Sequence, residues 1–121
     1  MDIRNIADAV PFRTVDGSEI RELLAYRNSC IRHQSLAEAT LPPGGATTRH
    51  YHPRAEEIYY ILTGEGRMEI SGDICQVGPG DAIAIPPGAP HQIQNTGPGL
   101  LKFLCCCAPC YEHEDTVLLP A

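Results

Sequence analysis

The stretch GGATTRHYHPRAEEIYYILTG, residues 44–64, decides the fold, because polar side chains interrupt a strand-forming pattern at one particular spacing. His50 and His52 lie two positions apart in a strand predicted over residues 47–52, so both imidazoles point to the same face. A proline ends that strand, and a second strand, rich in β-branched and aromatic residues, is predicted over residues 57–62. Two imidazoles on one strand face are half of a metal site.

A second segment, GDAIAIPPGAPHQIQN over residues 80–95, supplies another histidine. A Pro-Pro-Gly break precedes His91, which begins a further predicted strand. Glu57 begins the strand after the first two histidines, and strand parity places it on the same face as Tyr59. A sheet that folds back on itself would bring four polar side chains together: His50, His52, Glu57 and His91.

Three neutral imidazoles and one carboxylate form a mixed nitrogen and oxygen ligand set. This set suits one divalent transition metal (Fe, Mn, Ni, Co, Cu or Zn) and contains too much nitrogen for Ca²⁺ or Mg²⁺. In an octahedral complex, two positions would stay open for substrate, water or dioxygen. The alternative is that each histidine is an ordinary surface or core residue and that Glu57, beside Glu56, is a solvated charge. The combined spacing disfavours this alternative.

Turn-forming residues recur through the rest of the chain at the short intervals typical of an all-β protein. Eleven glycines and eleven prolines in 121 residues separate roughly eight to ten short predicted strands. Residues 71–73 indicate a tight hairpin, whereas residues 19–24 fit an edge strand or a helical turn. No long helix, internal repeat or linker is evident, so we expect one domain over residues 1–121, an antiparallel sandwich or barrel. The polar tail from residue 108 onward is expected to wrap the outside.

Composition limits the possible partners. The formal net charge of −6 and the pI of about 5.2 disfavour a binder of duplex nucleic acid, which needs a basic face. No apolar run is long enough for a membrane span, and residues 1–5 do not resemble a secretory signal. We therefore expect a cytoplasmic protein whose partner is a small-molecule substrate or ligand.

Six cysteines include the run Cys105-Cys106-Cys107, which does not resemble a disulfide framework, so reduced thiols are expected. Cys107 and Cys110 have the spacing of a CxxC redox pair or of a soft-metal site. No helix N-terminus is predicted there to activate a thiol. The favoured interpretation is that these cysteines serve as small buried hydrophobic residues.

The two quoted segments resemble the two sequence motifs of the cupin family. The first motif is matched by Gly44, His50-Tyr51-His52, Glu57 and Gly64, and the second by Gly80, Pro86-Pro87-Gly88, His91 and Asn95. The resemblance implies an all-β cupin barrel (a double-stranded β-helix or jelly roll, mainly antiparallel). It also implies that His50, His52, Glu57 and His91 are the metal ligands.

The resemblance leaves several functions open, because a fold does not by itself determine an activity. The first is a metal-dependent, dioxygenase-type enzyme for a small organic substrate, in which Glu57 could shuttle a proton and Tyr59 could orient the substrate. Core packing is an equally good interpretation of Tyr59. The second is a sugar-phosphate isomerase or epimerase, for which Arg49 and Arg54 offer thin support. The third is a binding module without catalysis.

Two further expectations concern the surroundings of the site. Many small cupins are homodimers, so a dimer is expected, and three predicted outward-facing residues could form its surface: Tyr60, Leu62 and Leu104. The predicted strands around the ligands also carry apolar residues that would make the pocket compact and suited to a small or aromatic substrate: Ile61, Ile83, Ile85 and Ile93.

Overall fold

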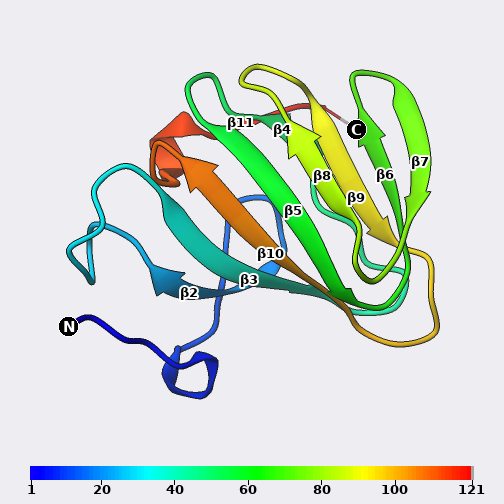
Figure 1. Ribbon diagram of the computed structural model, residues 1–121. Coiled ribbons are helices and arrows are strands. Elements are labelled where there is room, and N and C mark those ends of the chain that lie inside the picture. The colour runs from blue at the N-terminus through cyan, green and yellow to red at the C-terminus, as the bar shows by residue number, and fades with distance from the viewer. Residues whose placement is uncertain (121) are drawn as a thin grey trace.

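The structure is a computed structural model, and it describes residues 1–120. Two antiparallel sheets form the walls of a barrel (Figure 1). The first sheet has the order β1 (Phe12–Arg13), β2 (Glu19–Leu24), β3 (Ser35–Leu41), β10 (Leu101–Ala108), β5 (Glu56–Thr63) and β8 (Ala82–Ile85). The second has the order β11 (Val117–Leu118), β4 (His50–Tyr51), β9 (His91–Asn95), β6 (Gly66–Ile70) and β7 (Asp73–Val77). The all-β antiparallel barrel predicted from the sequence is confirmed.

Helical structure in residues 1–120 is confined to two single-turn 3₁₀ helices, η1 (Ile6–Asp8) and η2 (His113–Asp115). No helix in this part of the chain has both the length and the apolar character needed to cross a membrane.

The core lies between the two sheets because alternate residues of each strand point inward. In β5 the residues with inward side chains are Glu57, Tyr59 and Ile61, all buried, while Ile58 and Tyr60 are exposed on the outer face. The apolar cluster that fills the barrel includes Leu41, Ile61, Met68, Ile93, Leu101 and Phe103. The same alternation that buries Ile61 therefore also carries a carboxylate, Glu57, into the barrel interior.

Two turns show why particular residues are needed. In the β6–β7 hairpin, Ser71 (φ 49°) and Gly72 (φ 90°) both have positive φ, the geometry that matches the right-handed twist of the flanking strands. The hairpin predicted at residues 71–73 is thus confirmed. After β5, Gly64 (φ 88°) passes so close to β10 that a Cβ atom there would lie 2.5 Å from the carbonyl oxygen of Leu100.

Two predicted segments are settled at their boundaries. Residues 19–24 form a strand, β2, which is one of the two alternatives left open by the sequence. The strand predicted over residues 47–52 is shorter in the structure and covers only His50–Tyr51. The backbone just before it forms hydrogen bonds outside the sheet ladder, because the N–H of Thr48 donates to the carbonyl of Asp16 (2.6 Å).

The C-terminal tail does not simply wrap the outside, as the sequence suggested. Its strand β11 completes the second sheet by pairing with β4, with Leu118 opposite His50. In Figure 1 the tail runs along the upper rim of the barrel from η2 to β11. The edge of β4 would otherwise expose unpaired backbone groups, and β11 satisfies them.

The outer face of β5 is the expected dimer surface. Tyr60 is exposed there, whereas Leu62 and Leu104 are half-buried. A homodimer through this face stays a prediction, and light scattering that shows a monomer would contradict it.

Candidate metal site

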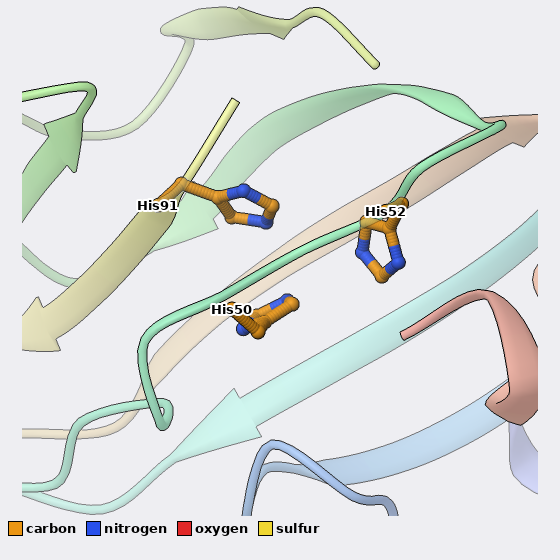
Figure 2. A group of neighbouring side chains, drawn as sticks. All are labelled: His50, His52 and His91. Carbon is orange, nitrogen blue, oxygen red and sulfur yellow. The ribbon is translucent and has the colours of Figure 1, made fainter. Parts of the chain in front are cut away.

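Three histidines from different parts of the chain meet inside the barrel (Figure 2). His50 lies in β4, His52 directly follows this strand, and His91 is the first residue of β9. The pairing of β4 with β9 places His50 directly opposite His91. One ring nitrogen of each histidine lies within 4.8 Å of the others, and all three rings are buried. The group has the residue types and spacing to hold a metal ion.

Backbone carbonyls fix the orientation of all three rings. Nδ1 of His50 lies 2.6 Å from the carbonyl oxygen of Thr48, and Nδ1 of His91 lies 2.9 Å from that of Ala89. Nδ1 of His52 lies 3.0 Å from the carbonyl oxygen of Asp115. A carbonyl oxygen can only accept, so each Nδ1 carries the proton and each neutral ring keeps its lone pair on Nε2. This is the tautomer that a metal-binding histidine requires.

Glu57 brings a carboxylate to the same place. Its Oε1 lies 3.3 Å from Nε2 of His52 and 3.7 Å from Nε2 of His91. Its Oε2 accepts a hydrogen bond from the Cys107 thiol at 3.0 Å. Glu57 Oε1 and His91 Nε2 are buried and have no hydrogen-bond partner within residues 1–120. Buried polar atoms without partners are costly, and a cation between these atoms would satisfy both.

The pKa values favour this ligand set. Burial, followed by the neighbouring His50, lowers the pKa of His91 to about 4, so this ring is neutral at physiological pH. Burial raises the pKa of Glu57, but the neighbouring His52 outweighs this effect and leaves the pKa lowered. Burial acts to lower the pKa of His52, but the neighbouring carboxylate of Glu57 outweighs burial and leaves this pKa raised. A bound cation would take the place of a proton on His52 as the positive charge that faces Glu57.

A small cavity opens beside His50, His52 and Glu57. Its volume is about 40 Å³, and a buried water needs roughly 10–15 Å³ measured in this way, so it holds a ligand of only a few non-hydrogen atoms. Its apolar wall is formed by Phe12, Ile20, Ala37, Ala39, Tyr59 and Phe103. The four isoleucines expected to line it do not do so; Ile61, Ile85 and Ile93 are core residues and Ile83 packs against them.

Tyr59 points into the barrel, as strand parity indicated. Its ring lies 4.6 Å from that of Phe103 and 5.9 Å from that of His91. Burial and then the charge of Glu57 raise the pKa of Tyr59 well above its usual range, so the hydroxyl keeps its proton. The side chain combines core packing with a place on the cavity wall.

Other residues considered from the sequence lie away from the cavity. The side chain of Arg49 forms an ion pair with Glu69 (3.1 Å). The contact of Arg54 with Asp115 is made by its backbone N–H, which donates a hydrogen bond to the Asp115 carboxylate. His33 is exposed. None of the three lines the cavity.

Two acidic residues at the site were missed. Asp16 Oδ2 lies 3.8 Å from Nε2 of His50, and Asp115 holds His52 through its backbone carbonyl. Asp16 precedes Gly17, and an Asp-Gly pair is typical of a turn and does not by itself indicate a functional site. Asp115 lies in a tail without a strand pattern. Neither has a local sequence signal, because each reaches the site through contacts with residues far along the chain.

The cysteines are all free thiols. Cys105 and Cys107 line the cavity, while the Cys110 thiol donates to the carbonyl of Gln34 at 2.9 Å. Burial, followed by the charge of Glu57, raises the pKa of both Cys105 and Cys107. The environment therefore suppresses thiolate formation, the opposite of what an activated CxxC pair needs.

Comparison with known proteins places this geometry in a family. The Cupin domain model matches residues 37–107. An uncharacterized protein of Methanocaldococcus jannaschii is 50% identical over 90% of this chain and 87% of its own length. The oxalate-binding protein of Thermotoga maritima is 36% identical over 71% of each chain. The crystal structure of a predicted oxalate decarboxylase from Thermotoga maritima has a TM-score of 0.79 at 29% identity, and covers 89% of this chain and 99% of that one. The chain therefore belongs to the cupin domain family.

Proposed function

We propose that this cupin is a metal-dependent, dioxygenase-type enzyme that acts on a small organic substrate. One divalent transition metal would be held by His50, His52, Glu57 and His91. The observation that carries the proposal is the convergence of three Nε2 atoms and one carboxylate oxygen, with His50, His52 and Glu57 at the wall of a small, largely apolar cavity. When bound, the metal would supply adjacent positions at which a substrate and dioxygen are oriented and polarised.

The chain's own residues would perform three tasks. The carbonyls of Thr48, Ala89 and Asp115 keep the three rings in the ligand tautomer. Glu57, whose Oε2 already receives a hydrogen bond from Cys107, is placed to hold or pass a proton beside the substrate. The wall of Tyr59 and Phe103 excludes water and admits apolar molecules such as dioxygen. Because both oxygen atoms enter the product of a dioxygenase, no external reductant is needed.

The cavity lining gives less support to a sugar-phosphate isomerase. A phosphate is normally bound by Arg, Lys or a row of backbone N–H groups. Among residues 1–120, no Lys or Arg lines the cavity, and the nearby Arg49 is paired with Glu69.

The second candidate function is ligand binding without turnover. It is favoured by the oxalate-binding relative from Thermotoga maritima, which is 36% identical to this chain. A metal centre with open positions binds a small carboxylate whether or not a reaction follows.

The decisive experiment begins with elemental analysis of protein purified without a chelator or a polyhistidine tag. Anaerobic loading with Fe²⁺ and an oxygen-uptake screen over small organic substrates follow. We expect one metal per chain and oxygen uptake that is lost in His50→Ala. His33→Ala is the matched control, because it removes an exposed histidine outside the cavity.

Three outcomes would contradict the proposal. Failure to take up any transition metal would remove the metal centre. Isomerisation of a substrate without oxygen uptake would favour the isomerase. Tight ligand binding with no turnover of any substrate would favour the binding module.

A further inference from the structure

Asp16 presents one fixed carboxylate oxygen to the cavity. Its Oδ1 accepts hydrogen bonds from the backbone N–H (2.9 Å) and the hydroxyl (2.7 Å) of Ser18. Its Oδ2 is left to face the cavity, 3.8 Å from Nε2 of His50. The side chain is only 13% exposed. The carboxylate is therefore held in one orientation, with one oxygen occupied and the other available.

The backbone ties Asp16 to the strand that carries His50. The carbonyl of Asp16 accepts from the N–H of Thr48 at 2.6 Å, and the carbonyl of Thr48 accepts from Nδ1 of His50 at 2.6 Å. A movement of the Asp16 turn would therefore disturb the histidine. This coupling makes Asp16 part of the wall of the candidate metal site and not a surface turn that happens to lie nearby.

With a divalent cation bound, the charges at the cavity would sum to zero. Glu57 and Asp16 would each contribute one negative charge, and together they would balance the cation. The third acidic residue in the lining, Glu22, is paired with Arg27 at 2.9 Å. No Lys or Arg within residues 1–120 lines the cavity to attract an anion. A dianionic ligand would thus meet no net positive charge and would have to approach Oδ2 of Asp16.

We propose that Asp16 is the specificity-determining residue of this cavity. It selects an uncharged small molecule that offers an O–H or N–H group to Oδ2, and it disfavours dianions such as oxalate. This inference rests on the proposed metal centre and narrows its substrate class. A site that hydrogen-bonds a donor group discriminates strongly against ligands that lack it, because its acceptor is then left unpaired.

The test uses a ligand series of nearly constant shape: oxalate with two negative charges, oxamate with one and neutral oxamide with N–H donors. Wild-type protein and Asp16→Asn are each loaded with Co²⁺, desalted and checked for one metal per chain. Titration is followed by the visible absorption of the bound Co²⁺. We expect oxalate affinity to rise at least tenfold in Asp16→Asn, with a smaller rise for oxamate. Oxamide affinity should fall, because its N–H group loses the acceptor Oδ2.

Glu22→Gln is the matched control, since it also removes a carboxylate from the lining but one already paired with Arg27. We expect its oxalate affinity to stay within threefold of wild type. Asn retains the acceptor for the Ser18 turn, and Asp16→Ser offers a second neutral residue suited to that turn should Asp16→Asn fail to fold.

The outcomes separate this inference from the metal proposal. One Co²⁺ per chain with unchanged oxalate affinity in both Asp16 variants would overturn the role of Asp16 and leave the metal centre standing. An equal gain in Glu22→Gln would show a general charge effect and would also overturn it. Wild-type protein that retains no Co²⁺ would overturn both.

Discussion

The backbone carbonyl oxygen of Asp115 lies 3.0 Å from Nδ1 of His52, although 63 positions separate the two residues. The carboxylate of the same aspartate accepts hydrogen bonds from the N–H groups of Arg54 (3.0 Å) and Ala55 (2.9 Å). Asp115 thus forms hydrogen bonds both with the candidate ligand His52 and with the loop at residues 54–55 that follows it. The tail is a structural component of the site.

Asp115→Ala should weaken metal binding. Loss of the carboxylate frees the tail from the 54–55 loop, so its carbonyl no longer holds the His52 ring. Removal of such an orienting contact typically lowers metal affinity about 10- to 100-fold. Competition with a chromophoric chelator measures the effect. Glu114→Ala removes the same charge from an exposed position of the same turn and should stay near wild type; equal losses in both variants would contradict the orienting role.

Metal loading should stabilise the fold through Glu57. A cation present at about 1,000 times its dissociation constant adds about 4 kcal/mol to the free energy of unfolding, which corresponds to a melting temperature roughly 15 °C higher. Glu57→Gln should lose most of this gain. Glu56→Gln, at the exposed neighbouring position, should keep it. Differential scanning calorimetry with and without EDTA distinguishes the two, and a full shift in Glu57→Gln would exclude that carboxylate as a ligand.

The metal-free protein should lose stability in mild acid because of His91. The pKa of this residue is about 4 in the folded chain, against an ordinary value of 6.5. Between these two pKa values the unfolded chain binds a proton at this residue that the folded chain does not. The free energy of unfolding is therefore unaffected by this residue above pH 6.5 and falls as the pH is lowered toward 4, by about 3 kcal/mol at most. His52, whose pKa is raised, acts in the opposite sense, and its contribution is lost as the pH rises through that raised pKa.

Urea unfolding in EDTA at several pH values tests this prediction. The slope of stability against pH between 6.5 and 4.5 should be smaller in His91→Gln than in wild type. His33→Gln, at an exposed position, should leave the slope unchanged. If His91→Gln showed the same slope as wild type, the loss of stability in mild acid could not be attributed to His91.

Gly64 and Gly72 should respond differently to alanine, although both have φ near 90°. At Gly72 nothing lies within 4 Å of the added Cβ, so only backbone strain of about 1–2 kcal/mol is expected. At Gly64 the Cβ would also lie 2.5 Å from the Leu100 carbonyl oxygen and 2.9 Å from the Leu101 Cα. We expect Gly64→Ala to cost at least about 2 kcal/mol more than Gly72→Ala in chemical denaturation. Similar losses would argue against close contact between this turn and β10.

Thiol labelling should separate the cysteines by position. Cys30 and Cys75 are exposed and should react quickly with iodoacetamide. Cys105 and Cys107 should react only on unfolding, because burial raises their pKa and limits access. Peptide mass spectrometry after a short pulse gives the answer. Rapid labelling of Cys107 in the native protein would show that Glu57 and the cavity do not shield it.

The sequence by itself determined the barrel and the residue types at its centre. Alternation in residues 57–62 places Glu57 inside with Ile61, because side chains of a strand alternate between faces whatever lies beyond it. The spacing of His50 and His52 put two imidazoles on one face for the same reason. These relationships hold between residues that are close in the sequence, so the order of residue types along the chain is enough to predict them.

Only the tertiary structure decided what surrounds that centre. Asp115 reaches His52 through a hydrogen bond, and Asp16 lies 3.8 Å from His50, in both cases across tens of residues of chain. The apolar wall comes from β1, β2, β3, β5 and β10 in place of the four expected isoleucines. Closing the barrel brings side chains from residues 12–18 and from residues 111–116 to the same cavity. Which side chains meet there depends on strand register and closure, and these are set by packing across the whole molecule.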